Sequence, residues 1–237
     1  GRSDKKDWRV RLQVPEGPLT EFFDFDKNPL LQPLAGSRGM FWPLTPSMVI
    51  QHSANYNAMA QTMDMTHSNY PHQAYQNSQV DSMNIIGEFP VQNSDDAKHW
   101  VATVNFLRTA TKMFFGKDEG TGKGLKGNPP PILHLFGYGD HMFHKIPVVL
   151  NSFNVELRAG IDYISTRQNP DGYSTPRTRE RMGLPELEEI QTWAPTLSNI
   201  SVLITPIYSR DSVKNFSMKK FVNGQLNGKG ANEVGFI

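Results

Sequence analysis

The clearest candidate for a nucleotide site is a glycine-rich loop that contains Thr121-Gly122-Lys123-Gly124. A phosphate-binding loop requires G-x-x-x-x-G-K-[ST], because its backbone amides surround the phosphate and its last hydroxyl binds Mg²⁺. Here Gly124 stands where that hydroxyl is needed, and Gly116 is one residue out of place. The loop also follows a predicted helix instead of a strand. We therefore expect an exposed, flexible hairpin and no phosphate site.

Nucleophile and acid–base patterns are also incomplete. A nucleophile elbow requires G-x-S-x-G, but Ser37 directly follows the first glycine of the nearest match. The carboxylate pair of Asp24 and Asp26, and the run of Glu186, Glu188 and Glu189, are of a kind found on any surface of this size. Glycoside hydrolysis by a pair of carboxylic acids would need two such groups on opposite sides of a cleft. We predict that the protein is not an enzyme.

Metal binding has little support among the seven histidines. His141 and His144 are three residues apart, and they follow a Gly-Tyr-Gly-Asp turn that predicts a strand, on which they would point to opposite faces. His67 and His72 flank Pro71, and no carboxylate nearby offers a third ligand. With no cysteine in the chain, thiolate sites and disulfides are excluded. We expect neither a metal nor a cofactor.

Composition narrows the classes of function further. The 237 residues carry a net charge of +1, with 20% charged and 38% hydrophobic residues. A protein that binds a nucleic-acid backbone shows a clear excess of basic residues, so this balance argues against that role. Low net charge gives little self-repulsion and favours association. The sequence contains no run of about eighteen apolar residues, which a membrane-spanning helix would need. We therefore expect no membrane partner.

One helix is clearly predicted, at about residues 95–115. Ser94 is the expected N-cap, Asp95 and Asp96 favour the first turn, and Gly116 supplies the stop. Apolar residues recur at steps of three and four, which indicates one buried stripe. This stripe consists of Ala97, Trp100, Val101, Val104, Leu107, Thr111 and Phe114.

The remaining pattern is that of strands and loops, so the fold is expected to be mainly β with long loops. Alternating residues predict strands at 8–14, 80–89, 142–157 and 199–205. We divide the chain into an N-terminal strand and arm at 1–39 and a β domain at 40–237.

A polar insertion at about 165–192 interrupts the β domain. Arginines in its first part precede the glutamate run at 186–189. Internal or intersubunit ion pairing and a solvated charged face are equally compatible with this order.

Residues 51–79 form an unusual segment that is rich in Asn, Gln, His, Met and Tyr and carries one carboxylate, Asp64. One interpretation is a long polar loop. The other is a surface that binds another protein chain, because amide, Tyr and Met side chains make contacts without the desolvation cost of a buried charge. The candidate interface residues are Tyr56, Met59, Met63, Tyr70 and Tyr75.

Five stretches together carry a resemblance to a known family: FLRTATKMFFG, GNPPPILHLFGYG, IPVVLNSFNVELRAGIDYI, PTLSNISVLITPIYSR and FSMKKFVNGQL. Their order resembles structural proteins of tailed bacteriophages that are related to the tail tube, in particular those that start the tube at the baseplate of a contractile tail. The similarity runs from about Met40 to the C-terminus. It implies a β-sandwich or small barrel with one flanking helix, and a long hairpin that joins neighbours in a hexameric ring. The polar insertion at 165–192 departs from a plain tube subunit.

The resemblance also implies partners and a location. These are copies of the chain itself in a homo-hexamer, adjacent tail-tube and baseplate-hub rings, the sheath as a further neighbour, and DNA that passes without sequence-specific contact. The implied location is the virion, after assembly in the host cytoplasm. If strands 80–89 and 148–157 line the channel, five polar residues are expected to face it, and their carboxylates would repel DNA. They are Ser82, Asn84, Glu88, Asn154 and Glu156.

An alternative from another class is a carbohydrate- or receptor-binding β-sandwich of a virion. Trp42, Tyr70 and Tyr75 would then be the platforms on which sugar rings stack.

Overall fold

The computed structural model describes residues 8–58, 69–70, 72–115, 126–167, 181, 192–230 and 233–237. Its strands are β1 (Arg11–Gln13), β2 (Gly39–Phe41), β3 (Ser47–Val49), β4 (His52–Ala58), β5 (Gln73–Val80), β6 (Met83–Pro90), β7 (Leu133–Gly137), β8 (Phe143–Glu156), β9 (Tyr163–Ser165), β10 (Trp193–Pro195) and β11 (Leu197–Pro206). Its helices are α1 (Pro18–Phe23), the 3-10 helix η1 (Gln32–Leu34), α2 (Ser94–Ala110), α4 (Arg210–Lys214) and α5 (Met218–Val222).

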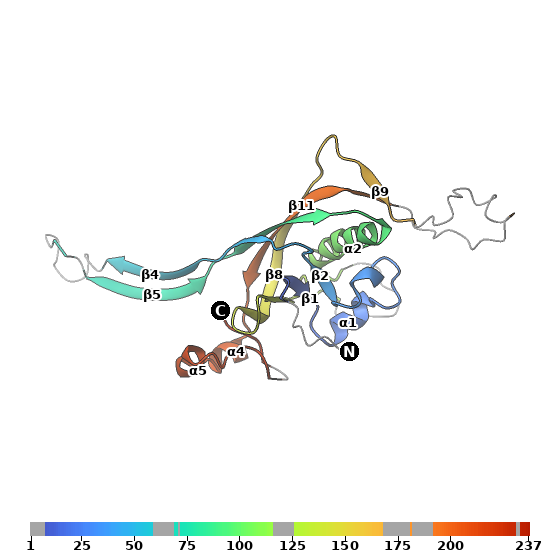
Figure 1. The fold of residues 1–237 in the computed structure, drawn as a ribbon. Coiled ribbons are helices and arrows are strands. Elements are labelled where there is room, and N and C mark those ends of the chain that lie inside the picture. The colour runs from blue at the N-terminus through green and yellow to red at the C-terminus, as the bar shows by residue number, and fades with distance from the viewer. Residues whose placement is uncertain are drawn as a thin grey trace.

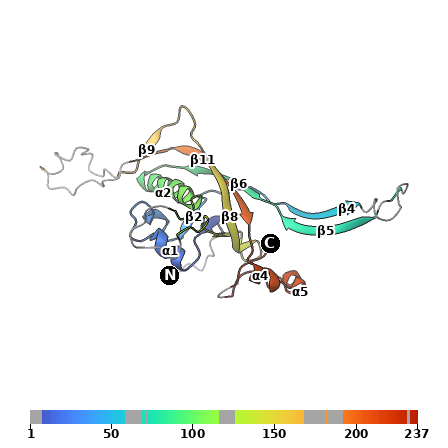
Figure 2. The same cartoon turned by 180° about the vertical axis from the view of Figure 1, so that it is seen from behind.

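Seven strands form one antiparallel sheet in the order β2-β1-β7-β8-β11-β6-β3. Two further pairs, β4–β5 and β9–β10, extend from it in different directions (Figure 1). The view from behind shows helix α2 lying against the main sheet (Figure 2). The prediction of a mainly β chain with a flanking helix is confirmed.

The sheet curls around its core, so that its two ends approach each other. Trp42 directly follows β2 at one end and is completely buried. Its indole ring lies against Gly87 of β6, near the other end, where an added Cβ would come 2.1 Å from Trp42 Cδ1. Only a residue without a side chain allows this contact. The curl, in place of a second packed sheet, encloses the apolar side chains.

Helix α2 closes the open side of this curl. Its His99 ring lies between two strands, with its centroid 4.3 Å from that of Phe41 in β2 and 6.3 Å from that of Phe89 in β6. One turn of the helix therefore bridges both ends of the sheet. The neighbouring Trp100 donates a buried hydrogen bond of 2.8 Å from Nε1 to Oγ of Ser198 in β11. This bond gives the buried indole N–H of Trp100 and the buried hydroxyl of Ser198 a hydrogen-bond partner.

Both ends of α2 differ from the prediction. Its N-cap is Asn93, not Ser94, because the Asn93 side chain accepts a 2.8 Å hydrogen bond from the Asp96 amide. The helix ends at Ala110 instead of near 115. Beyond it, the Phe114 amide donates to the carbonyl of Asn128, which is a tertiary contact that local sequence does not reveal.

The predicted strand at 80–89 is wrong as a single element, because the chain breaks at Asp81 and Ser82 between β5 and β6. The Asp81 carboxylate accepts hydrogen bonds from Ser53 and Gln79, and its amide donates to the Gln51 carbonyl. These bonds hold the two strands of the β4–β5 hairpin together at its base.

The N-terminal part also differs from the prediction in detail. The expected strand at 8–14 is shortened to β1, which pairs with β2 on one side and β7 on the other. The expected irregular arm contains helix α1. Residues of the 1–39 segment thus contribute an inner strand to the main sheet.

The polar insertion leaves and re-enters the fold through the β9–β10 pair, where the Thr166 amide donates to the Thr192 carbonyl. Residues 168–180 and 182–191 of the insertion, and the glycine-rich loop at 116–124, lie outside the described residues.

The first prediction concerns the contact between Trp42 and Gly87. Gly87→Ala is expected to lower the free energy of unfolding by ~1–3 kcal/mol, because the new methyl group would overlap the indole ring. Gly36→Ala is the matched control, since an added Cβ there meets nothing within 4 Å. Urea unfolding of both variants measures the difference. Equal losses would contradict the proposed contact.

The second prediction concerns acid stability. Burial lowers the pKa of His99 from 6.5 to about 4; Asp96 opposes this shift and Arg9 adds to it. The folded protein thus holds His99 neutral in the interval where an unfolded histidine takes up a proton. The contribution of His99 to the free energy of unfolding is fully present above pH 6.5. It is lost as the pH falls to about 4, and the total loss is about 3 kcal/mol.

Other groups also titrate in this range, so the measurement is a comparison. We expect the free energy of unfolding of wild type to fall more steeply between pH 6.5 and 4.5 than that of His99→Leu. Parallel pH profiles for the two proteins would show that His99 does not contribute.

Candidate functional site

A polar surface lies on the side of the sheet away from α2. It is built by β6, β11 and β8, with β11 in the middle. Asn199 of β11 is paired with both Glu88 and Glu156, and Ser201 is paired with both Ile86 and Asn154. Because successive side chains of a strand point to opposite faces, these rows share one face. Alternate residues such as Val202 are fully buried on the other face.

We call this surface the polar face. The structure places all five predicted channel-facing residues on it. Asn84 and Glu88 come from β6, and Asn154 and Glu156 come from β8. Ser82 lies just before β6, and its Oγ is 2.8 Å from Oγ1 of Thr205 at the end of β11. Their role in a channel stays a prediction.

The five predicted channel-facing residues did not include any residue of β11, the central strand of the polar face. β11 contributes Asn199, Ser201, Leu203 and Thr205 to the polar face. The signal was present in the sequence, because Asn199, Ser201 and Thr205 alternate there with buried Ile200, Val202 and Ile204. What the sequence did not contain was the pairing that sets β11 between the two other strands.

The polar face presents amides, hydroxyls and two carboxylates, together with the apolar side chains of Ile86 and Leu203. Asn199 Nδ2 donates a 3.1 Å hydrogen bond to Glu156 Oε2, and Arg158 Nε lies 3.6 Å from Glu156 Oε1 at the rim. The rows described above contain no histidine or lysine that could serve as a general base for the hydroxyl groups. The hydrogen-bonding side chains of the polar face suit contact with water or other polar groups.

The second feature is the β4–β5 hairpin, which projects far beyond the sheet (Figure 1). Residues 52–80 contain one carboxylate and no lysine or arginine. Tyr56 is paired with Tyr75, their ring centroids lie 5.6 Å apart, and each is 57% exposed. Asn55 Nδ2 also donates to Asn77 Oδ1 across the strands. The interpretation of this segment as a long loop is therefore wrong for 52–58 and 73–80.

Of the five predicted interface residues, the structure pairs Tyr56 with Tyr75 and leaves Tyr70 87% exposed. Met59 and Met63 lie outside the described residues. Their role in an interface stays a prediction.

The structure contradicts the stacking platform proposed for the carbohydrate-binding alternative. Trp42 is completely buried between β2 and β6, so no sugar can reach its ring. The contact of its ring with Gly87 makes Trp42 part of the core. Tyr70 and Tyr75 remain exposed.

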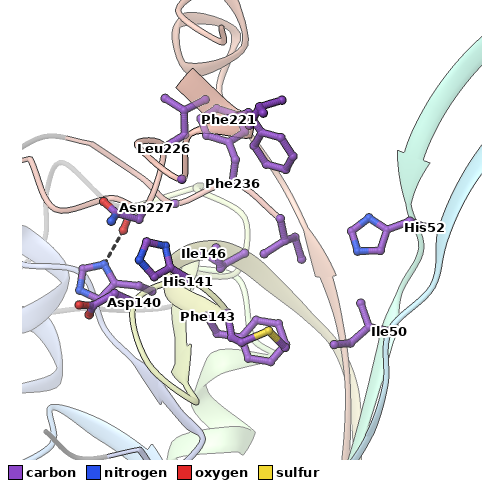
Figure 3. Close-up of a pocket in the computed structure, with 16 residues that line it drawn as sticks. Ile50, His52, Asp140, His141, Phe143, Ile146, Phe221, Leu226, Asn227 and Phe236 are labelled. Carbon is purple, nitrogen blue, oxygen red and sulfur yellow. Dashed lines mark hydrogen bonds between the residues drawn. The ribbon is translucent and has the colours of Figure 1, made fainter. Parts of the chain in front are cut away.

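His144 lies in β8 as predicted, but His141 is placed differently. His141 lies in the turn before β8, not in the strand, and both residues border a cavity under the C-terminal segment (Figure 3). His144 Nδ1 is 2.7 Å from the Asn227 carbonyl oxygen. Among the described residues, no group of three or more His, Cys, Asp or Glu could hold a metal ion.

Comparison with known proteins finds no family model that matches the chain and no match among curated proteins. Within the described ranges, no helix has both the length and the apolar character needed to cross a membrane.

The third prediction tests the electrostatic character of the polar face. Glu88 and Glu156 flank Asn199 at a spacing of roughly 10 Å, so Glu88→Lys/Glu156→Lys would present two cations in one row. We expect this variant to bind duplex DNA about 10-fold more tightly than wild type, with a steeper loss of affinity as salt is raised. Fluorescence anisotropy at two salt concentrations measures this.

The matched control is Glu21→Lys/Glu233→Lys, which changes the net charge equally at two exposed positions off the polar face. Equal gains in DNA affinity for the two variants would show that net charge alone matters.

Proposed function

We propose that this chain is a structural subunit of a ring in a bacteriophage tail, at the tail tube or at the junction of baseplate and tube. The observation that carries the proposal is the projecting β4–β5 hairpin. The resemblance of the sequence to tail-tube-related proteins supports the same conclusion, and it supplies the hexameric state and the position in the tail.

The hairpin is more easily explained in an assembly than in a monomer. A two-stranded hairpin alone is marginally stable in water, and β4 and β5 pair only with each other among the described strands. Its exposed tyrosines and amides carry no charge that would have to be desolvated on contact with a neighbour. Packing against a second copy would therefore stabilise both the hairpin and the assembly.

A second feature supports lateral association. β7 pairs with β8 only as far as Val148, while β8 continues to Glu156. Within the described residues, no strand is hydrogen-bonded to that edge of β8 from Val149 onward. An unpaired edge is a template for pairing with another chain. A hairpin on one part of the subunit and an open edge on another make a heterologous contact, which closes into a ring when the rotation permits.

In this ring, the polar face would line the channel. Glu88 and Glu156 would repel the phosphates of passing DNA, while amides and hydroxyls would keep the wall wetted without binding sites for bases. The proposed role is mechanical: the ring templates tube assembly between the adjacent tail-tube and baseplate-hub rings and leaves a path for DNA. We propose no catalytic step.

The fourth prediction tests the hairpin directly. Replacing residues 54–78 with Asn-Gly would join Ser53 to Gln79 through a two-residue turn and keep the hairpin base at Asp81. We expect wild type to form rings in negative-stain images and the shortened variant to remain a single chain in mass photometry. Far-ultraviolet circular dichroism checks that the variant is folded. A wild-type monomer at high concentration, or rings from the shortened variant, would refute the proposal.

A further inference from the structure

The C-terminal part of the chain presents a second surface that the ring proposal does not use. We call residues 207–226, which contain α4 and α5, the C-terminal module. Its apolar side chains are unusually exposed, and neither helix has a buried residue. The side chains between 37% and 71% exposed are Ile207, Val213, Phe216, Met218, Phe221 and Val222. The rings of Phe216 and Phe221 lie 5.7 Å apart. Exposed apolar side chains that gather on one surface mark an interaction site.

The module is held in a fixed position. Phe236 from the last residues of the chain stacks on Tyr208 at 4.5 Å and contacts Phe216 at 5.3 Å. The Gly235 amide donates to the Lys145 carbonyl of β8, which joins this layer to the main sheet. The surface is therefore preorganised for a partner.

A cavity of about 360 Å³ borders the module. Phe221 and Val222 of α5 line one side of it, and Phe143 and Ile146 of β8 line another (Figure 3). The cavity is large enough to receive apolar side chains from a partner.

The charge of the module indicates what kind of partner fits. It has four basic residues and one acidic residue, all exposed: Arg210, Lys214, Lys219, Lys220 and Asp211. A complementary segment would carry carboxylates beside apolar side chains. The chain itself contains such a segment at 184–190, Leu-Pro-Glu-Leu-Glu-Glu-Ile. Three of its 23 acidic residues fall there within four positions.

Within one chain, this segment is too far from the module. Thr192 is fixed beside β9 by a 3.1 Å hydrogen bond from its amide to Thr166 Oγ1. Glu186 precedes Thr192 by six residues, which span at most roughly 20 Å. β11 runs between β10 and α4, and its ten residues extend over roughly 33 Å. Figure 1 shows β9 and α5 at opposite ends of this strand. The partner must therefore be another molecule.

We propose that the C-terminal module of one copy binds residues 184–190 of a second copy. Leucine and isoleucine side chains of the segment would contact the exposed apolar residues and the cavity, and its glutamates would pair with Lys219 and Lys220. The contact joins opposite ends of β11 in the two copies, so it is head-to-tail along the strand. It goes beyond the ring proposal, because neither the hairpin nor the edge of β8 takes part.

The fifth prediction uses a fluorescent peptide of residues 182–191 and the full chain in an anisotropy titration. We expect saturable binding that weakens with salt. Lys219→Glu/Lys220→Glu should weaken it at least 10-fold, and a peptide with Glu188→Lys and Glu189→Lys should bind this variant better than it binds wild type. Lys112→Glu/Lys126→Glu is the control with the same change of charge at exposed positions outside the module.

The outcomes separate this inference from the ring proposal. Absence of binding at millimolar peptide, or an equal loss in the control variant, overturns the inference even if rings form. Binding of the peptide by the hairpin-shortened chain supports the inference whether or not that chain forms rings. Failure of the reversed peptide to prefer the reversed module shows that the charges are not in contact, which also overturns it.

Discussion

The pairing of β11 between β6 and β8 is the constraint on which the rest of the structure depends. It aligns Ile200, Val202 and Ile204 with the apolar side chains of both neighbours, and α2 packs on that side. The same register aligns the polar residues on the opposite side. Since side chains alternate along a strand, a shift of one residue would move the apolar set into solvent and bury the carboxylates. The register that buries the apolar side chains therefore also fixes which side chains lie on the opposite face of the sheet.

The molecule divides into a tightly packed centre and weakly supported extensions. Trp42, Gly87, His99 and Trp100 connect the two ends of the curled sheet with α2. The β4–β5 hairpin and the C-terminal helices have few buried side chains of their own. The hairpin, unlike the anchored C-terminal module, pairs with no other described strand and opens locally at low free energy, so it gains the most from a partner.

The two proposed contacts differ in chemistry. The hairpin offers uncharged tyrosines and amides, which suits a permanent lateral contact from which charge is absent. The C-terminal module combines lysines with exposed apolar side chains, which suits an acidic partner and gives a salt-dependent contact. The polar face carries the carboxylates of Glu88 and Glu156. It is the surface that a ring would leave open to its channel.

The sequence by itself determined the elements whose faces differ in polarity. Helix α2 and the alternation of β6, β8 and β11 were predictable, and with them the five polar-face residues, because burial on one side leaves a periodic pattern. The hairpin was not predictable as strands, because both of its faces are polar and no period of two appears. The burial of Trp42, the position of β1 between β2 and β7, and the early end of α2 depend on residues far apart in the chain. Only the tertiary structure decided them, since local periodicity records which side of an element is apolar but not which element covers it.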